Sequence, residues 1–140
     1  MTLLVSSADA RNLKLMAFDV DGVLTDGRLY YGPDGEALKV FNTLDGHGLK
    51  KLAASGVTLA LITGRDTPMV ARRATELGIQ HVIQGREDKG VALADLAASL
   101  GVTARETGYA GDDEPDVPAL QWAQIAFAPS SGHDCARAAA

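Results

Sequence analysis

The sequence predicts an α/β fold: a Rossmann-like parallel sheet with helices on both faces and a small β-hairpin inserted after the first strand. Three observations predict it. Short apolar runs alternate along the chain with longer segments of helical periodicity. A glycine follows three of the helical segments, as is common at helix C-termini. The 140 residues, 46% hydrophobic and 22% charged, suit a single domain over residues 1–140.

The expected strands are five short apolar runs. They cover residues 13–18, 57–62, 79–83, 106–110 and 124–128. Because a helical segment separates most neighbouring runs, the strands are expected to be parallel and joined by right-handed crossovers. Their carboxyl ends then lie at one edge of the sheet, where such folds bind ligands.

The expected helices lie between these strands. They cover residues 45–55, 68–77 and 88–100, and a shorter one ends at residue 122. Gly56, Gly78 and Gly101 follow the first three. Pro68 suits a first helical turn, where the backbone N–H needs no partner. The last stretch, residues 129–140, has a weak pattern and is expected to be a mobile tail.

A hairpin is expected within an insertion over about residues 28–42. The runs Leu29–Tyr31 and Ala37–Phe41 flank the segment Gly32-Pro33-Asp34-Gly35. Proline presets a turn dihedral angle, and glycine accepts a positive φ. The two adjacent tyrosines are expected to form a subunit contact, because an exposed apolar hairpin edge needs covering.

Charge and composition exclude several classes of function. The net charge of −5 disfavours nucleic acid and anionic lipid as partners. A single cysteine, Cys135, excludes an internal disulfide and fits a reducing compartment. The sequence contains neither a signal-peptide pattern nor a run of about 18 apolar residues. A cytoplasmic protein is therefore expected.

Polar residues with complementary chemistry follow the predicted strands. Asp19 and Asp21 come after the first strand, Thr63 after the second, Lys89 opens the helix after the third, and Asp112 follows the fourth. Carboxylate oxygens such as those of Asp19 and Asp112 suit Mg²⁺. This set favours phosphoryl transfer at the shared edge of the sheet.

Each of these residues has an expected role. Asp19 attacks phosphorus, and Asp21 protonates the leaving oxygen and then deprotonates water. Thr63 offers a hydroxyl group, Gly64 admits backbone N–H groups to the phosphate, and Lys89 supplies positive charge. Two further acidic residues are expected to orient the groups around the metal. They are Asp113 and Asp116.

Four motifs together resemble those of haloacid dehalogenase superfamily phosphatases. They are Phe18-Asp19-Val20-Asp21-Gly22-Val23-Leu24-Thr25-Asp26-Gly27, then Thr63-Gly64-Arg65, then Lys89, and finally Gly111-Asp112-Asp113-Glu114-Pro115-Asp116. The chain leaves no room for a cap domain. With the hairpin and the following Phe41–Lys50, it resembles the capless 3-deoxy-D-manno-octulosonate 8-phosphate phosphatase family. The resemblance covers about residues 13–128.

The resemblance implies a Mg²⁺-dependent phosphomonoesterase that releases phosphate from this sugar acid through an aspartyl-phosphate. It also implies a homotetramer, a role in lipopolysaccharide biosynthesis, and metal binding by Asp19, Asp112 and the backbone carbonyl of Asp21. The implied substrate contacts are Asp21, Asn42, Thr43, Leu44, Asp45, Gly46, Lys50, Gly64, Arg65, Arg73 and Lys89. Arginine and lysine suit a substrate that carries phosphate and carboxylate groups.

The chain departs from that family in two places. Leu44 stands where many relatives have arginine, so the substrate carboxylate is expected to be held differently. Relatives continue through another strand and a glycine-rich tail, which residues 129–140 do not resemble. This departure predicts either a truncated chain or a more open site.

Three other functions remain open from the sequence. One is a phosphatase for another sugar-acid phosphate. Another is a signalling receiver domain, although Lys89 precedes the acidic cluster and no aspartate ends the third strand, contrary to the receiver order. The last is a non-catalytic binding or assembly subunit with a degenerate site, against which the four intact motifs argue.

Overall fold

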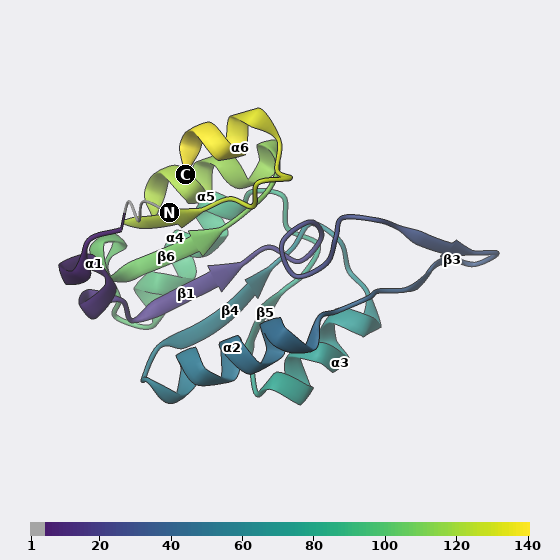
Figure 1. Ribbon diagram of the computed structural model, residues 1–140, viewed down its shortest axis with the longest axis horizontal. Coiled ribbons are helices and arrows are strands. Elements are labelled where there is room, and N and C mark those ends of the chain that lie inside the picture. Colours follow the sequence, from purple (N-terminus) through teal and green to yellow (C-terminus); the bar gives the residue numbers. More distant parts are fainter. Residues whose placement is uncertain (1–4) are drawn as a thin grey trace.

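A five-stranded parallel sheet forms the centre of the molecule (Figure 1). The computed structural model describes residues 5–140. The strands are β1 (Leu15–Phe18), β4 (Thr58–Ile62), β5 (His81–Ile83), β6 (Thr107–Ala110) and β7 (Ile125–Phe127), in the order β5-β4-β1-β6-β7. Strand β1 is central and pairs in parallel with both β4 and β6. The predicted parallel α/β sheet is confirmed.

Helices cover both faces of this sheet (Figure 1). Helices α2 (Thr43–Ala54) and α3 (Pro68–Leu77) lie on one face. Helices α4 (Lys89–Ser99), α5 (Val117–Trp122) and α6 (Asp134–Ala139) lie on the other. A short α1 (Ser7–Asn12) and two 3₁₀ turns, η1 (Ala104–Glu106) and η2 (Glu114–Asp116), complete the fold.

Two hydrophobic cores follow from the alternation of side chains along β1. Leu15 and Ala17 point into the core beneath α4, α5 and α6, whereas Met16 points into the core beneath α2 and α3. All three side chains are almost fully buried. Burial on both faces explains why the strands read as continuous apolar runs in the sequence.

The hairpin projects away from the sheet (Figure 1). It consists of β2 (Tyr30–Gly32) and β3 (Gly35–Leu38), joined by the two-residue turn Pro33-Asp34. Gly35 has a φ of +113°, which only glycine adopts without strain. The second strand is shorter than predicted: Val40 and Phe41 lie in the loop that leads to α2.

The expectation of a mobile tail is wrong for residues 134–139, which form α6. The side chain of His133 accepts a hydrogen bond from the backbone N–H of Cys135 and so caps this helix. Ala136 is fully buried against the core. The pattern was weak because small alanines, which carry little hydrophobic signal, make the contacts of this helix.

The hairpin is the only insertion of regular structure between β1 and α2, and the part of the chain described here has no cap domain over the sheet. Across residues 5–140, none of the helices has the length and apolar character needed to cross a membrane. Because the described residues include no cap domain, no further domain covers the loops at the carboxyl ends of the strands.

Candidate active site

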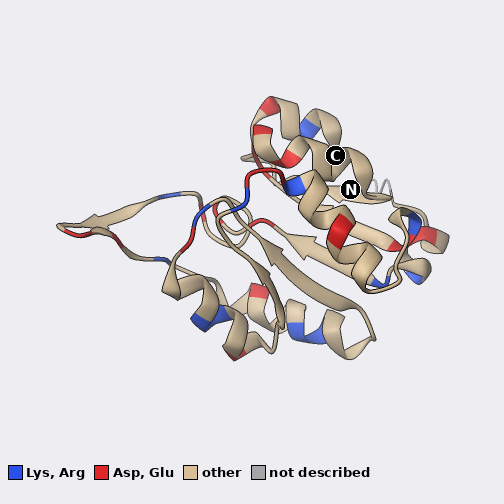
Figure 2. Ribbon diagram, turned by 180° about the vertical axis from the view of Figure 1, so that it is seen from behind, with Lys and Arg blue, Asp and Glu red and all other residues tan. Residues whose placement is uncertain are grey.

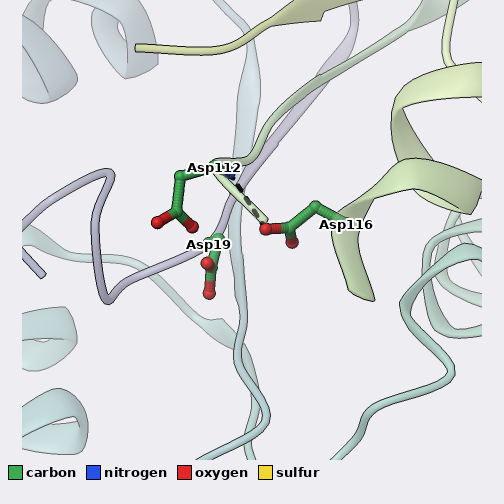
Figure 3. Close-up of side chains that lie close together, drawn as sticks. All are labelled: Asp19, Asp112 and Asp116. Carbon is green, nitrogen blue, oxygen red and sulfur yellow. Dashed lines mark hydrogen bonds between the residues drawn. The ribbon is translucent and has the colours of Figure 1, made fainter. Parts of the chain in front are cut away.

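Two neighbouring strands bring the predicted acidic residues together. Asp19 directly follows β1, and its backbone N–H donates a hydrogen bond to Ala110 O at the end of β6, at 2.9 Å. Asp112 lies two residues beyond Ala110. Carboxylate oxygens of Asp19, Asp112 and Asp116 lie within 4.8 Å of one another (Figure 3). The adjacency of β1 and β6 in the sheet therefore creates a cluster from residues that are far apart in sequence.

A tight loop after β1 presents Asp19. The N–H groups of Val23, Leu24 and Thr25 all donate to Val20 O, at 2.9–3.2 Å. Gly22 has a φ of +88°, and a Cβ atom there would lie 1.8 Å from an Asp112 carboxylate oxygen. Only glycine at this position lets the carboxylate of Asp112 lie against the loop.

Asp116 is fully buried and organises the other groups. One of its oxygens accepts hydrogen bonds from Lys89 Nζ at 2.8 Å and from the Tyr109 hydroxyl at 2.6 Å. The other accepts from the backbone N–H of Asp112 at 3.0 Å (Figure 3) and from that of Asp113 at 3.2 Å. Because four donors occupy its two oxygens, Asp116 is suited to orienting the loop rather than to binding a metal ion.

Lys89 joins two of these carboxylates. Its Nζ lies 3.0 Å from Asp19 Oδ1 and 2.8 Å from Asp116 Oδ1, and its side chain is 6% exposed. Burial lowers the pKa of Lys89, but the charges of Asp19 and Asp116 outweigh this effect and raise it. Lys89 therefore carries a fixed positive charge beside Asp19.

The aspartates of the cluster have shifted pKa values in different directions. Burial, together with the negative charge of Asp116, raises the pKa of Asp19 to about 8 although Lys89 opposes this. Burial and the charges of Asp116 and Asp113 also raise the pKa of Asp112. Burial would raise the pKa of Asp116 as well, but the charge and hydrogen bond of Lys89 lower it. Asp116 is thus the ionised partner of Lys89.

The residues present fit a hard divalent cation. Three carboxyl groups, those of Asp19, Asp112 and Asp116, lie close together beside a single lysine, Lys89. Carboxylate oxygens are the ligands that Mg²⁺ prefers, and it commonly takes only one or two of them from the protein. Asp19 and Asp112 are therefore the side chains suited to hold it.

A cavity of about 400 Å³ opens at this edge of the sheet. Nine predicted site residues line it: Asp19, Asp21, Thr63, Gly64, Arg65, Lys89, Asp112, Asp113 and Asp116. Figure 2 shows acidic and basic segments together on the loops at this edge, beside the base of the hairpin. The cavity brings together carboxylates, an ammonium group and a hydroxyl group, which are groups suited to phosphoryl transfer.

Comparison with known proteins agrees with this geometry. The model of the haloacid dehalogenase-like hydrolase family matches residues 30–124. The chain is 44% identical over 117 residues to the 3-deoxy-D-manno-octulosonate 8-phosphate phosphatase KdsC of Haemophilus influenzae, covering 84% of this chain and 65% of that protein. It is 40% identical to KdsC of Escherichia coli K12, covering 90% of this chain and 67% of that protein.

The chain belongs to the haloacid dehalogenase-like hydrolase family. The resemblance drawn from its four motifs is confirmed. A solved structure of 3-deoxy-D-manno-octulosonate 8-phosphate phosphatase from Moraxella catarrhalis, in complex with a magnesium ion, a phosphate ion and KDO, superimposes with a TM-score of 0.92 at 44% identity. The alignment covers 95% of this chain and 76% of that one. The chain spans about two thirds of the length of the curated relatives it matches.

The other predicted substrate contacts of this family member lie away from the acidic cavity. Asn42, Thr43 and Asp45 line a separate hollow of about 550 Å³ at the base of the hairpin. Leu44 is 78% exposed, and Lys50 is also exposed. Within one chain, the structure therefore does not bring this segment together with Asp19.

Gly46 and Arg73 form a contact between α2 and α3. Gly46 is buried, and a Cβ atom there would meet the Arg73 guanidinium at 2.5 Å. Arg73 also donates to Asn42 O at 3.3 Å and lies over the ring of Phe41, 5.6 Å from its centroid. The hydrogen bond and the contact with the Phe41 ring thus tie α3 to the segment that enters α2.

Sequence reasoning missed several polar residues around the site. Tyr109 is fully buried in β6 and donates to Asp116, and a tyrosine within a buried strand is a signal that its hydroxyl has a partner. Glu87 lines the acidic cavity without any motif to mark it. Lys39, directly after β3, contacts both Asp21 and Glu36, and nothing local in the sequence indicates this.

Proposed function

We propose that this protein is a Mg²⁺-dependent phosphomonoester hydrolase that works through an aspartyl-phosphate on Asp19. The observation that carries the proposal is the arrangement of Lys89 between Asp19 and Asp116, with Asp112 beside them, in an open cavity at the sheet edge. Family membership and the relatives named as phosphatases support it.

The first half-reaction transfers the phosphoryl group to the protein. An Asp19 oxygen attacks phosphorus, the bond from phosphorus to the ester oxygen breaks, and that oxygen takes a proton from Asp21. Lys89, Thr63 and the backbone N–H groups around Gly64 stabilise the phosphoryl oxygens as charge shifts onto them.

The second half-reaction restores the protein. Asp21, now a carboxylate, takes a proton from a water molecule that attacks phosphorus, and the bond to Asp19 breaks. Inorganic phosphate leaves, with Asp19 again ionised and Asp21 again protonated. A bound Mg²⁺, held by Asp19, Asp112 and the backbone carbonyl of Asp21, would supply positive charge that offsets repulsion between the carboxylates and the phosphate. Asp113 and Asp116 would orient this set of groups.

The proposed substrate is 3-deoxy-D-manno-octulosonate 8-phosphate. The relatives are named for this substrate, and the solved Moraxella structure contains KDO. Arg65 lies in the acidic cavity, where its guanidinium suits an anionic substrate. We propose that residues 42–46, Lys50 and Arg73 also contact this substrate.

We also propose a cytoplasmic homotetramer. Residues 42–50 lie apart from the acidic cavity of their own chain, so a neighbouring copy is the proposed source of these substrate contacts. The hairpin carries exposed apolar side chains suited to such an assembly: Leu29, Tyr31, Leu38 and, just beyond it, Val40. The proposed substrate places the reaction in lipopolysaccharide biosynthesis.

The variant D19N tests the reaction. It removes the nucleophile while keeping the size of the side chain, so Mg²⁺-dependent phosphate release is expected to fall by at least about 10³-fold. The measurement is the initial rate on sugar phosphates with and without Mg²⁺, with the fold checked by circular dichroism. The control is D95N, because Asp95 is exposed on α4 and lines neither the acidic cavity nor the hollow at the base of the hairpin.

Unchanged phosphate release by D19N would contradict the mechanism. Stable phosphorylation of the wild-type protein by a small phosphodonor, without turnover, would instead favour a receiver domain. Equal activity with and without Mg²⁺ would exclude the proposed metal requirement.

A further inference from the structure

The hairpin places a buried lysine behind Asp21. Lys39 Nζ lies 2.6 Å from Asp21 Oδ1 and 2.7 Å from Glu36 Oε2. The side chains of Lys39 and Glu36 are 1% and 6% exposed, whereas that of Asp21 is 21% exposed. Asp21 lines the acidic cavity, but Lys39 does not. Of the residues that line this cavity, Lys39 therefore contacts Asp21, and it does not itself line the space where a phosphate would bind.

Four side chains of opposite chemistry meet around Asp21. Two basic groups, Lys39 and Arg65, lie beside the carboxyl groups of Asp21 and Glu36. Arg65 is the looser member, at 3.9 Å from Asp21 Oδ2 and 3.7 Å from Glu36 Oε1. Because a buried ammonium group is costly without partners, Glu36 and Asp21 together hold Lys39 in place.

The two oxygens of Asp21 differ as a result. Oδ1 accepts a short charge-assisted hydrogen bond from Lys39, whereas Oδ2 lies beyond hydrogen-bond distance of Arg65. A proton on Oδ1 would compete with the N–H of Lys39 for the same lone pairs. Oδ2 is therefore the oxygen available to carry a proton toward the cavity.

We propose that Lys39, anchored by Glu36, is a positioning residue that fixes the Asp21 carboxyl group with Oδ2 as its proton-transferring oxygen. The inference deepens the proposed function and rests on it. When the phosphorus–oxygen bond of the ester breaks, the proton moves from Oδ2 to the leaving oxygen and the negative charge stays on Asp21. Lys39 keeps all its protons and stabilises that carboxylate until water returns a proton.

The same arrangement recurs at the nucleophile. Lys89 contacts Asp19 and is anchored by Asp116, just as Lys39 contacts Asp21 and is anchored by Glu36. The lysines come from different parts of the fold, the first turn of α4 and the end of the hairpin. Each of the two aspartates with a proposed catalytic role thus contacts a different buried lysine.

The dependence of the rate on the leaving group tests this role. An alkoxide leaving group requires protonation, whereas p-nitrophenolate leaves readily without it. The variant K39M is expected to lose about 10²-fold in kcat/KM, which reports the step in which the leaving group departs, on 3-deoxy-D-manno-octulosonate 8-phosphate. The expected loss on p-nitrophenyl phosphate is less than about tenfold, both with Mg²⁺. Phenyl phosphate is expected to show an intermediate loss.

Matched variants separate positioning from folding. K51M removes an exposed lysine of α2 and is expected to match the wild-type protein on all three esters. E36Q keeps an acceptor for Lys39 but removes the anchoring charge, so a smaller loss in the same order of esters is expected. If circular dichroism shows that K39M does not fold, the losses measured for E36Q test the role of Lys39.

Equal losses on all three esters, or no loss on any, with an active wild-type protein would overturn the role of Lys39 and leave the proposed function standing. A wild-type protein that hydrolyses none of the esters with Mg²⁺ would overturn the proposed function, and this inference with it.

Discussion

Asp19 and Asp21 stand two residues apart, yet their side chains have different surroundings. Asp19 is buried beside Lys89 and Asp112. Asp21 is partly exposed and contacts Lys39. Different neighbours separate the proposed roles of two chemically identical groups, one as nucleophile and the other as proton carrier.

Asp116 is expected to matter for stability as well as for activity. The variant D116N should lower the free energy of unfolding by about 3–5 kcal/mol, because it breaks a buried ion pair and turns an amide group toward the Lys89 ammonium. Urea unfolding measures this change.

The matched control is D113N. Asp113 is exposed and accepts a hydrogen bond from Glu114 N–H, which asparagine can also accept, so a change below about 0.5 kcal/mol is expected. Equal destabilisation by the two variants would contradict the organising role of Asp116.

Single residues differed in how far the sequence could predict them. Asp19, Thr63, Lys89 and Asp112 were predicted to share one edge because each follows a strand or opens a helix there, and all of them line the acidic cavity. Lys39 could not be predicted, because its contact with Asp21 spans 18 residues and depends on how the hairpin folds back.

The sequence predicted the hairpin but not helix α6, and the reasons differ. Pro33 and Gly35 mark the turn locally, so the hairpin was predicted, although its second strand ends earlier than expected. Helix α6 was missed because its fully buried residue, Ala136, makes a contact that depends on close packing rather than on hydrophobic periodicity.

A charge at the base of the hairpin should disrupt the proposed assembly. Val40 is 55% exposed, and V40D is expected to reduce the tetramer to smaller species, because an interface would bury the new carboxylate without a partner. Size-exclusion chromatography with light scattering measures the mass.

Val91 on α4 provides the control, since it is 56% exposed but lies far from the hairpin in sequence, and V91D should leave the mass unchanged. A monomeric wild-type protein, or a tetramer in V40D, would contradict an assembly through the hairpin.

The molecule as a whole gathers negative charge at one end of its sheet. Folding raises the pKa of Asp19 from 3.8 to about 8, so the metal-free fold binds a proton there that the unfolded chain releases. The resulting stabilisation is full below about pH 4 and is lost as the pH rises through 8. Protons and Mg²⁺ therefore compete for Asp19.

Stabilisation by Mg²⁺ is expected to increase with pH. Between about pH 6 and pH 8, a metal that displaces one proton gains about tenfold in affinity per pH unit, or about 1.4 kcal/mol. Thermal unfolding with and without millimolar Mg²⁺ measures the effect.

The variant D112N, which removes the second carboxylate proposed to hold the metal, should abolish this stabilisation at both pH values. The same shift in Tm at pH 6 and pH 8 in the wild-type protein would contradict binding at Asp19.

Local chemistry was enough to predict the class of fold, the hairpin turn and the acidic, hydroxyl and lysine groups of the proposed reaction. Apolar periodicity, turn residues and the ligands that Mg²⁺ prefers are properties of short segments, so the chain reveals them directly. The order β5-β4-β1-β6-β7, the four donors to Asp116 and the burial of Lys39 behind Asp21 depend on contacts between distant segments. Those contacts exist only after the sheet and hairpin have folded, and they give each aspartate its own surroundings.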